Sequence, residues 1–444
     1  MPALVRNGFR GGDAGGTEPP RETERPRGGD AEGADRLSPA PRRGPTLRRV
    51  RVIEVPGGVP ICSWAPEVEP SALEQAVNLA RLPFAIDHVA LMPDAHAGYG
   101  MPIGGVLFAE AAVVPYAIGV DIGCGVALAE TDLLAGALGR RGLRDVLEAI
   151  ERDVPTGRRS QPRPVDRHRA EEEIGVGRPA SIERAWWERG IDQLGTLGSG
   201  NHFLEVQRDP DGRVCVMLHS GSRSLGKAIC DAFQRRALAG NLARREPLPH
   251  RELAYLREGT PDFDAYWAAM AYARRFAEVN RARMLAVVER AFEAHTRVRR
   301  FERLVDIHHN DAARELHVVD GRRREGLVHR KGAVRARAGE PVLVPGSMET
   351  ASYVGVGLGN PDAFETCQHG AGRAMSRTAA RRARSAPAVL AAMEAEGVLL
   401  LAGDRGAVAE EAGFAYKDIE AVMGASADLV RPVRRLTPLG VVKG

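Results

Sequence analysis

The sequence predicts an α+β protein with mixed β-sheets surrounded by helices. Segments typical of strands and of helices follow one another in blocks, which disfavours the βαβ alternation of a doubly wound sheet. Residues 93–126 are rich in glycine and contain short apolar runs typical of strands. Residues 262–297 instead carry large apolar side chains at roughly helical spacing, so we expect one long helix packed on the core.

The N-terminal segment, residues 1–45, is rich in Gly, Pro, Arg and Glu and contains almost no large apolar side chains. Such a segment cannot bury enough surface to offset the entropy lost on ordering. We therefore expect a disordered extension at 1–45 and a folded domain at 46–444. The chain of 444 residues is long enough for a large core or for two lobes.

The expected elements follow in chain order. The first half contains a strand at 47–56, a helix at 71–82 whose N-cap is Ser71, strands at 104–109 and 125–130, a helix at 140–151, an Arg- and Pro-rich surface segment at 154–180, and a helix at 181–194. The second half contains strands at 202–207 and 213–219, the long helix at 262–297, strands within 303–310, 315–321, 326–336, 341–348 and 352–359, and helices at 372–396 and 404–425.

Two of these strands flank "DPDG" (209–212), where Pro and Gly indicate a reverse turn. If the hairpin closes symmetrically, His202 lies directly opposite His219, with Cβ atoms ~5 Å apart. A type I turn with a glycine bulge at Gly212 shifts the register and removes this direct pairing. The sequence leaves both registers open.

The composition is typical of a globular protein, with 44% hydrophobic and 27% charged residues. No run approaches the ~18 apolar residues of a membrane span, and the N-terminus lacks the apolar stretch of a secretory signal. The five cysteines are odd in number and irregularly spaced, so we expect reduced thiols and a cytoplasmic protein. Residues 1–50 hold ten arginines against seven acids, and the rest of the chain has only local arginine clusters. Each cluster suits either phosphates or solvent, and there is no broad basic field for coating a duplex.

The motif "GVDIGCGV" (119–126) places an acid and a thiol on glycine-rich backbone that can approach a ligand closely. Four histidines stand in similar glycine- or asparagine-rich settings at strand ends: His202, His219, His309 and His369. Together with Asp121 and Cys124, the first three histidines exceed the four ligands of one tetrahedral ion. A bridging thiolate indicates two ions ~3.5–4 Å apart. The mixed oxygen, nitrogen and sulfur donors leave zinc, manganese and iron open.

Three further segments could bind phosphates. "VPGSMETASY" (344–353) offers amides and hydroxyls in a tight turn, and "HRKGAVRA" (329–336) adds cationic side chains. "HGAGRAMSR" (369–377) places glycines just before an expected helix, whose N-terminus favours an anion. Combined with a metal set, these segments point to a nucleoside triphosphate.

Motifs along residues 50–444 resemble, in order, those of the RtcB family of RNA ligases: "MPDAHAGYGMPIGGV", "GVDIGCG", "GTLGSGNHFLE", "HSGSRSLG", "HHN", "RKGA", "PGSM..ASY", "HGAGR.MSR", "YKDI..V" and "VKG". The resemblance implies an RtcB-like catalytic domain at 46–444 with its active site in a central cleft. The implied enzyme joins an RNA 3′-phosphate or 2′,3′-cyclic phosphate end to a 5′-hydroxyl end, in RNA splicing, tRNA processing or RNA repair. The implied cofactors are GTP and two Mn²⁺ ions. The implied partners are these RNA ends and an archease-like activator of a monomeric enzyme, without a membrane.

Carried over by motif, His369 is the nucleophile that takes GMP, and Asp94 holds its second ring nitrogen. Glu205 reads the guanine edge by accepting its N–H donors. His308 is not the implied ligand, because the motif places the ligand directly before the asparagine. The implied manganese ligands are Asp121, Cys124 as the bridge, His202, His219 and His309. The implied guanylate pocket contains Asn201, His202, Phe203, Leu204, Glu205, His309, Asn310, Pro345, Gly346, Ser347, Met348, Ser352, His369, Gly370, Ala371, Gly372 and Lys443.

One residue departs from the family pattern, since Glu349 stands where glycine is usual. A carboxylate there repels phosphates unless it points away or meets a cation. Two other functions stay open, namely a metal-dependent RNA-end phosphoesterase on the same scaffold and a non-catalytic RNA-binding protein. His369 favours the ligase over the phosphoesterase, because hydrolysis needs no guanylylated histidine. The intact metal ligands argue against the binding protein.

Overall fold

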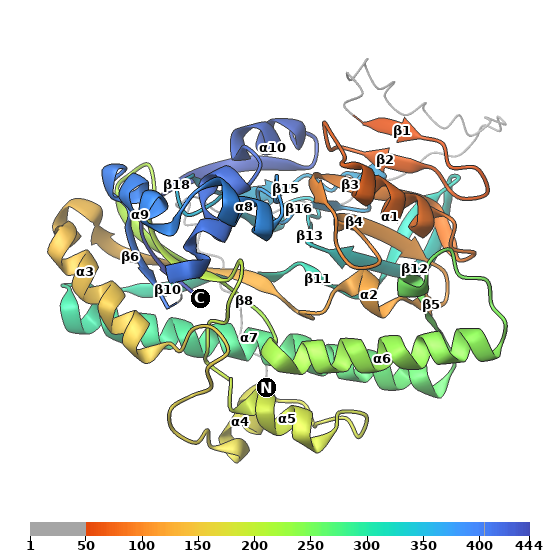
Figure 1. Ribbon diagram of the computed structural model, residues 1–444, viewed down its shortest axis with the longest axis horizontal. Coiled ribbons are helices and arrows are strands. Elements are labelled where there is room, and N and C mark those ends of the chain that lie inside the picture. Colours follow the sequence, from red (N-terminus) through yellow and green to blue (C-terminus); the bar gives the residue numbers. More distant parts are fainter. Residues whose placement is uncertain (1–49, 404) are drawn as a thin grey trace, which may run out of the picture. The chain divides into compact units, whose positions relative to one another are not determined.

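Two large β-sheets have helices packed around them (Figure 1). The computed structural model of the protein describes residues 50–403 and 405–444. The extension expected at 1–45 therefore lies outside the described residues. Within the described part, helices and sheets are mixed along the chain, and the predicted α+β class is confirmed.

The first sheet has six strands and is antiparallel except for the parallel pair β2–β3. Its strands β3 and β4 are buried over almost their whole length. In spatial order the strands are β1 (Arg51–Ile53), β2 (Ile61–Ser63), β3 (Ala85–His96), β4 (Ile103–Ala109), β12 (Arg322–Lys331) and β11 (Asn310–Val319).

The second sheet has eight strands, of which β17 (Leu399–Ala402) pairs in parallel with β18 beside the main path. Two small two-stranded sheets complete the described strands: β13 (Ala333–Arg335) with β16 (Thr366–Gln368), and β5 (Ala112–Val113) with β9 (Leu256–Arg257). Along its main path the second sheet contains β10 (Phe301–His308), β6 (Gly125–Leu134), β8 (Arg213–Ser220), β7 (Phe203–Arg208), β18 (Val430–Lys443), β15 (Ser352–Gly357) and β14 (Pro341–Val344).

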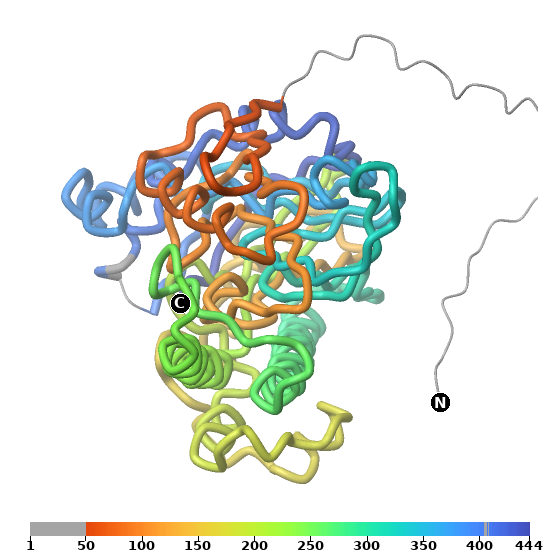
Figure 2. The backbone as a smooth tube through the Cα atoms, turned by 90° about the vertical axis from the view of Figure 1, so that its right-hand side faces the viewer, coloured from red at the N-terminus to blue at the C-terminus, as the bar shows by residue number. Residues whose placement is uncertain are grey.

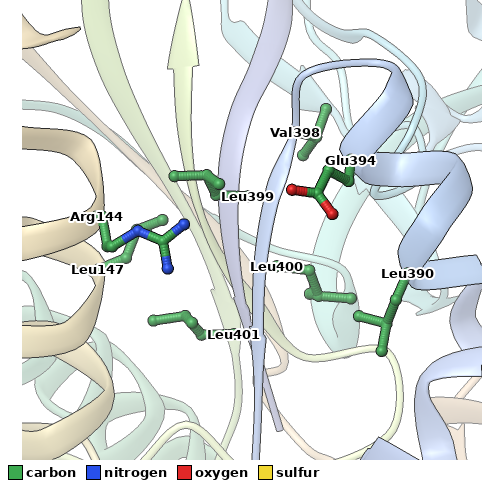
Figure 3. A pocket seen from close by; sticks show the side chains of 8 residues that line it. All are labelled: Arg144, Leu147, Leu390, Glu394, Val398, Leu399, Leu400 and Leu401. Atoms are coloured by element: carbon green, nitrogen blue, oxygen red, sulfur yellow. The ribbon is translucent and has the colours of Figure 1, made fainter. Parts of the chain in front are cut away.

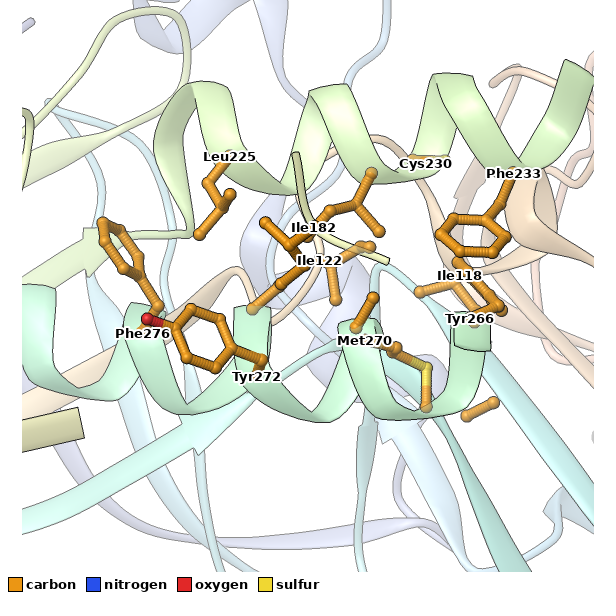
Figure 4. Packing of buried hydrophobic residues seen from close by; sticks show 14 of the residues in the cluster. Ile118, Ile122, Ile182, Leu225, Cys230, Phe233, Tyr266, Met270, Tyr272 and Phe276 are labelled. Carbon is orange, nitrogen blue, oxygen red and sulfur yellow. The ribbon is translucent and has the colours of Figure 1, made fainter. Parts of the chain in front are cut away.

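Two long helices, α6 (Arg223–Ala243) and α7 (Pro261–His295), run side by side (Figures 1 and 2). Figure 4 shows the apolar core between them, where Phe233 and Leu225 of α6 face Tyr266 and Phe276 of α7. Burying each such side chain contributes about 1.5–3 kcal/mol. The remaining helices are α1 (Pro70–Ala80), α2 (Pro115–Ile118), α3 (Ala135–Asp153), α4 (Arg167–Ile174), α5 (Arg184–Ile191), α8 (Arg377–Ala383), α9 (Ala386–Ala395) and α10 (Ile419–Ala425), with short 3₁₀ helices at Arg251–Leu253, Pro361–Ala363, Arg405–Glu411 and Gly413–Ala415.

The helix boundaries differ from the sequence prediction at both ends of the chain. The first helix is capped at Glu69 rather than Ser71, because Pro70 occupies its first turn and lacks the amide that a cap would satisfy. The helix expected at 372–396 is two helices, since the Ser376 hydroxyl caps α8 and a proline opens α9. Only α10 is α-helical in the described part of 404–425. The elements not predicted are α2, α4, α6, β2, β3, β5, β9, β16, β17 and β18.

The β7–β8 hairpin has the bulged register rather than the symmetric one. Phe203, not His202, lies opposite His219. Gly212 has φ +81°, and its amide donates to the Asp209 carbonyl at 3.0 Å. The glycine bulge therefore shifts the pairing by one residue, and His202 precedes the first residue of β7.

No helix in the described part of the chain combines the length and apolarity needed to cross a membrane. The five cysteines are all unpaired, and four of them are buried.

Candidate active site

A cavity of about 700 Å³ is lined by residues from both large sheets, including Cys124, Glu205, His309 and His369. A second cavity of about 250 Å³ lies beside β17 between α3 and α9 (Figure 3). Its lining consists of leucines and a valine with Arg144 and Glu394, and it has no histidine or cysteine. The larger cavity is therefore the one equipped for the predicted chemistry.

The five predicted metal-binding side chains gather at the larger cavity, four of them in its lining and His202 behind it. Cys124 Sγ lies 3.4 Å from His202 Nε2 and 3.2 Å from His219 Nε2. His202 Nε2 lies 3.0 Å from Asp121 Oδ2, and His219 Nε2 lies 3.3 Å from His309 Nε2. The donor atoms form two groups of three, and the Cys124 sulfur belongs to both.

The chemistry of these donors fits bound cations. The Nδ1 atoms of His202 and His219 lie 2.9 and 3.2 Å from the backbone carbonyls of Leu197 and Asn201, which can only accept. Both Nδ1 atoms therefore carry hydrogen, and both Nε2 lone pairs point at the cluster. Burial lowers the pKa of His219 and of His309 well below the usual 6.5, so both rings are neutral. Imidazole lone pairs, a carboxylate and a thiol that a cation would deprotonate converge here, and this set fits two cations that share Cys124.

The acid and the thiol of the cluster respond differently to burial. Burial opposes ionisation of Asp121, but the adjacent His202 ring, 3.0 Å from Oδ2, lowers the pKa of this carboxyl to about 2. Burial, reinforced by the Asp121 carboxylate, raises the pKa of the Cys124 thiol well above 9. The charge of a bound cation reverses this tendency, because a coordinating thiol is deprotonated.

Two glycines allow the close approach of the loops. Gly123 has φ +71°, which side chains rarely adopt, and a Cβ there would lie 2.7 Å from the Cα of Arg274. A Cβ on Gly221 would lie 2.3 Å from Asp121 Oδ2. The next amide, of Ser222, donates to Asp121 Oδ1 at 2.9 Å and fixes the carboxylate.

Two adjacent buried residues of α7 tie these loops together. The Arg281 guanidinium donates to the carbonyls of Gly123 and Ser220 at 3.0 and 2.9 Å, directly beside two ligand positions. The Asn280 side chain accepts from the Gly195 amide at 2.7 Å and donates to the Gly221 carbonyl at 3.1 Å. Sequence reasoning missed this pair, although two polar residues inside an apolar helical stripe are a signal.

His369 lies next to the cluster, with its ring centroid 4.9 Å from that of His309. Its Nδ1 lies 2.7 Å from a carboxylate oxygen of the buried Asp94, whose other oxygen has no hydrogen-bond partner. The same Asp94 oxygen accepts from the His369 amide at 3.3 Å. The predicted pairing of Asp94 with the second ring nitrogen is therefore present, and it leaves Nε2 of His369 as the lone-pair atom.

Most residues of the predicted guanylate pocket line the cavity, but two do not. Leu204 lies in the apolar core with Val206 and Leu218, because alternate residues of a strand face opposite sides. His202 lies behind the lining in the metal-binding cluster. Asn310 does line it, yet its amide group already bridges the Asp121 carbonyl and the Gly332 amide at 3.1 and 2.8 Å.

Glu205 and Lys443 form the polar end of this pocket. Burial raises the pKa of Glu205 to about 8, although the amide of Gln207 donates to it and lowers the pKa in part. The Lys443 ammonium lies 3.7 Å from Glu411 Oε2, and burial lowers its pKa. A buried carboxyl beside a buried ammonium suits the donors and the acceptor of a planar base.

The predicted phosphate loops are arranged differently from expectation. The amides of Gly346 and Ser347 donate to the hydroxyls of Ser352 and Thr350 at 3.2 and 2.8 Å. In "HGAGRAMSR" the helix begins only at Arg377, so the glycines do not stand at its N-terminus. The carboxylate of Glu349 accepts from the Gly413 amide at 3.2 Å and does not line the cavity.

The cavity also contains residues that the sequence prediction did not name. Among them are Glu69, His96, Tyr99, Tyr116 and Arg373. His96 and Tyr99 stand inside "MPDAHAGYGMPIGG", so the motif itself was the available signal. The remaining histidine beside the cluster, His308, is held by Asp311 at 2.8 Å, away from the ligands.

The chain matches the family described as "tRNA-splicing ligase RtcB" over residues 75–176 and 162–444. It is 38% identical over 418 residues to the RNA-splicing ligase RtcB of Escherichia coli, covering 87% of this chain and 97% of that protein. It is 37% identical to the RNA-splicing ligase RtcB of Mycobacterium tuberculosis, covering 83% of this chain and 100% of the relative. The tRNA-splicing ligase RtcB of Thermococcus kodakarensis is 34% identical, with 84% and 91% covered.

Proposed function

The chain belongs to the RtcB family, and from this premise we propose that it is a GTP- and Mn²⁺-dependent RNA ligase. It joins an RNA 3′-phosphate or 2′,3′-cyclic phosphate end to a 5′-hydroxyl end. The observation that carries the proposal is the Asp94–His369 pair, with Nδ1 and carboxylate 2.7 Å apart, placed beside the five-residue donor cluster. A hydrolase needs such a cluster but needs no histidine that takes GMP.

The donor groups divide naturally between two ions. Asp121, Cys124 and His202 would hold one Mn²⁺, and Cys124, His219 and His309 would hold the other. When bound, the ions supply positive charge that neutralises the transferring phosphoryl group. The backbone carbonyls of Leu197 and Asn201 keep the two imidazole lone pairs aimed at the ions.

His369 acts as the nucleophile. Asp94 accepts the Nδ1 hydrogen, so the Nε2 lone pair attacks the α-phosphorus of GTP, and pyrophosphate leaves. As the ring gains positive charge, the buried carboxylate stabilises it. The phosphoramidate then passes GMP to the RNA 3′-phosphate, the 5′-hydroxyl attacks the activated phosphorus, and GMP leaves. A cyclic phosphate end is first opened by water.

The pocket beyond His369 selects the guanine base. Glu205 accepts the N–H donors of its edge, and Lys443 donates to its carbonyl oxygen. Burial raises the pKa of Glu205 to about 8 and so disfavours its carboxylate form. The N–H donors of a bound guanine would stabilise that carboxylate. We further propose that the enzyme works in the cytoplasm as a monomer, with an archease-like activator.

The test is covalent labelling with radiolabelled GTP and Mn²⁺. We expect an acid-labile, alkali-stable label on the wild-type protein and none on His369→Ala. The matched control is His295→Ala, which changes an exposed histidine at the end of α7 and should label normally. Opening of cyclic phosphate ends by a wild-type protein that takes no label would favour the phosphoesterase instead.

A further inference from the structure

Gln207 is a wholly buried amide next to the predicted guanylate pocket. It lies on β7 two residues after Glu205, so the two side chains are on the same face of the strand. Glu205 lines the cavity, whereas Gln207 lies beyond the lining. Opposite Gln207 on β8 is Cys215, which belongs to an apolar cluster with Met217 and Leu436. A polar amide in such surroundings is costly unless its hydrogen bonds are made, so its partners indicate what it is for.

Both amide hydrogens of Gln207 are donated to residues of the pocket. One goes to a carboxylate oxygen of Glu205, and the other goes to the hydroxyl of Ser352 at 3.1 Å. The carbonyl oxygen of the same amide is buried and has no hydrogen-bond partner among the described residues. The hydrogen bonds of the Gln207 side chain are therefore directed to two side chains that line the cavity.

These two hydrogen bonds fix which pocket residue accepts and which donates. An ionised Glu205 can only accept, and the Gln207 donor favours that ionised form. Ser352 Oγ accepts from Gln207 and, at 3.2 Å, from the Gly346 amide. Both lone pairs of the hydroxyl are then used, so its own hydrogen is left to donate into the cavity. The pocket thus offers an acceptor at Glu205 and a donor at Ser352.

The charges near Glu205 leave this task to Gln207. Burial raises the pKa of Glu205 to about 8, and the Gln207 hydrogen bond and the Lys443 ammonium both act to lower it. The Lys443 ammonium lies 3.7 Å from a carboxylate oxygen of Glu411, so its charge is shared between two acids. The charged side chains beyond Lys443 are Glu411, Arg373 and Arg377. Gln207 is the neutral donor that acts on Glu205 directly.

We infer that Gln207 is a positioning residue that sets the base specificity of the nucleotide pocket. It holds Glu205 as an acceptor and Ser352 as a donor. This polarity favours guanine, whose Watson–Crick edge presents N–H donors, over adenine, whose ring nitrogen at the same edge accepts. The role rests on the proposed ligase function. Because Gln207 lies beyond the cavity lining, it acts on binding of the base and not on the transfer of GMP to His369.

The test measures formation of the protein–GMP adduct by the full chain with Mn²⁺, over a series of GTP concentrations. Gln207→Met keeps the length of the side chain and removes both donors. Its half-saturating GTP concentration should rise ~10–100-fold, because the hydrogen bond to a charged group is lost. Its maximal rate should stay within about twofold of wild type, since no interaction specific to the transition state is removed. Its preference for GTP over ATP should fall ~10-fold.

The pH profile separates this role from a merely structural one. In wild type, the rate at low GTP concentration should rise with pH as Glu205 ionises in the free enzyme. Without the Gln207 donor the ionised form is less favoured, so the rise should move to higher pH by about one pH unit. Gln234→Met is the matched control. Gln234 on α6 is also buried, has an unpartnered carbonyl oxygen and donates to the Arg251 carbonyl at 3.2 Å, so its variant should keep the wild-type profile.

Three results with Gln207→Met would overturn the inference. They are an unchanged GTP dependence, a lower maximal rate at unchanged half-saturation, and weaker GTP binding without a moved pH profile, which is the mark of a packing role. If this variant does not fold, Gln207→Asn withdraws the amide from Glu205, and an unmoved profile there counts equally against the inference. A wild-type protein that takes no GMP refutes the ligase function instead, and this outcome is seen before any variant is compared.

Discussion

Replacing Asn280 by alanine should weaken metal binding from a position that touches no metal ligand side chain. Asn280 lies on α7 and is wholly buried. Its side chain makes hydrogen bonds to two segments of the chain. One is the backbone of Gly195 and Thr196, which precedes His202. The other is Ser220 and Gly221, which follow His219. Alanine leaves these two segments without their common anchor.

The expected loss of stability follows from the hydrogen bonds. In Asn280→Ala the Gly195 amide loses its acceptor, and an orphaned buried donor costs about 1–3 kcal/mol. The Thr196 amide keeps the Gln193 carbonyl at 3.2 Å, and Ser220 keeps the Leu197 carbonyl at 2.8 Å. The freed carbonyls of Thr196 and Gly221 add about 1 kcal/mol together. We therefore expect the free energy of unfolding to fall by about 3 kcal/mol.

Metal affinity should fall about tenfold in the same variant, since outer-shell changes typically cost 10–100-fold. The assays are urea unfolding and calorimetric titration of the metal-free protein with Mn²⁺, at a temperature where the variant stays folded. Asn241→Ala is the matched control, because Asn241 is equally buried and bonds both backbone groups of Tyr255, away from the ligand loops. If both variants lose stability and both bind Mn²⁺ like wild type, Asn280 supports the fold and not the metal site.

Four further outcomes can be measured. Cys124→Ser should lower the Mn²⁺ content found by elemental analysis after dialysis, since a serine oxygen bridges poorly, and unchanged content rejects the bridge. Asp94→Asn should slow formation of the GMP adduct at least ~10²-fold without a large loss of urea stability, because the His369 tautomer is no longer fixed. Burial raises the pKa of Glu205 from 4.5 to about 8, so between these pH values the folded state holds a proton that the unfolded state has lost. The contribution of Glu205 to the free energy of unfolding therefore falls as the pH rises from about 5 to 8. Glu205→Gln should flatten this pH dependence in urea titrations. Glu349→Gly should leave GTP affinity within twofold of wild type, since this carboxylate faces the Gly413 amide; a tenfold gain would show that it repels the nucleotide.

The candidate metal ligands could be singled out in the sequence because each combines a ligating side chain with a glycine-rich or asparagine-rich strand end. Their proximity did not depend on the hairpin register, however. The symmetric register would have placed His202 opposite His219, and the bulge at Gly212 removes that pairing. The two rings still lie 5.2 Å apart, because His202 stands before the strand and the Leu197 carbonyl holds its ring toward the cluster. A hydrogen bond inside the loop 197–202, between residues five apart in the sequence, replaces the cross-strand contact.

The last strand, β18, shows why local signals fail in another way. Pro432 and Pro438 argue against a strand, because proline cannot donate to a ladder. In the structure the pairing of β18 with β15 shifts between Val354 and Gly355, where Pro432 lies, and its pairing with β7 shifts just after Pro438. The prolines thus occupy irregular positions of both ladders. Such positions are visible only once the partner strands are known.

The long helix α7 shows which features of the structure can be predicted from the sequence and which cannot. Its apolar spacing predicted both the helix and its packing, because side-chain chemistry and period suffice for that. Asn280 and Arg281 interrupt the same stripe, and their partners are backbone atoms of Gly195, Gly221, Gly123 and Ser220. A backbone carbonyl is identical in every residue, so nothing in the sequence marks which ones a buried guanidinium will meet. Candidate metal ligands can therefore be predicted from residue type. The buried residues that position these ligands, such as Asn280 and Arg281, can be identified only once the fold is known.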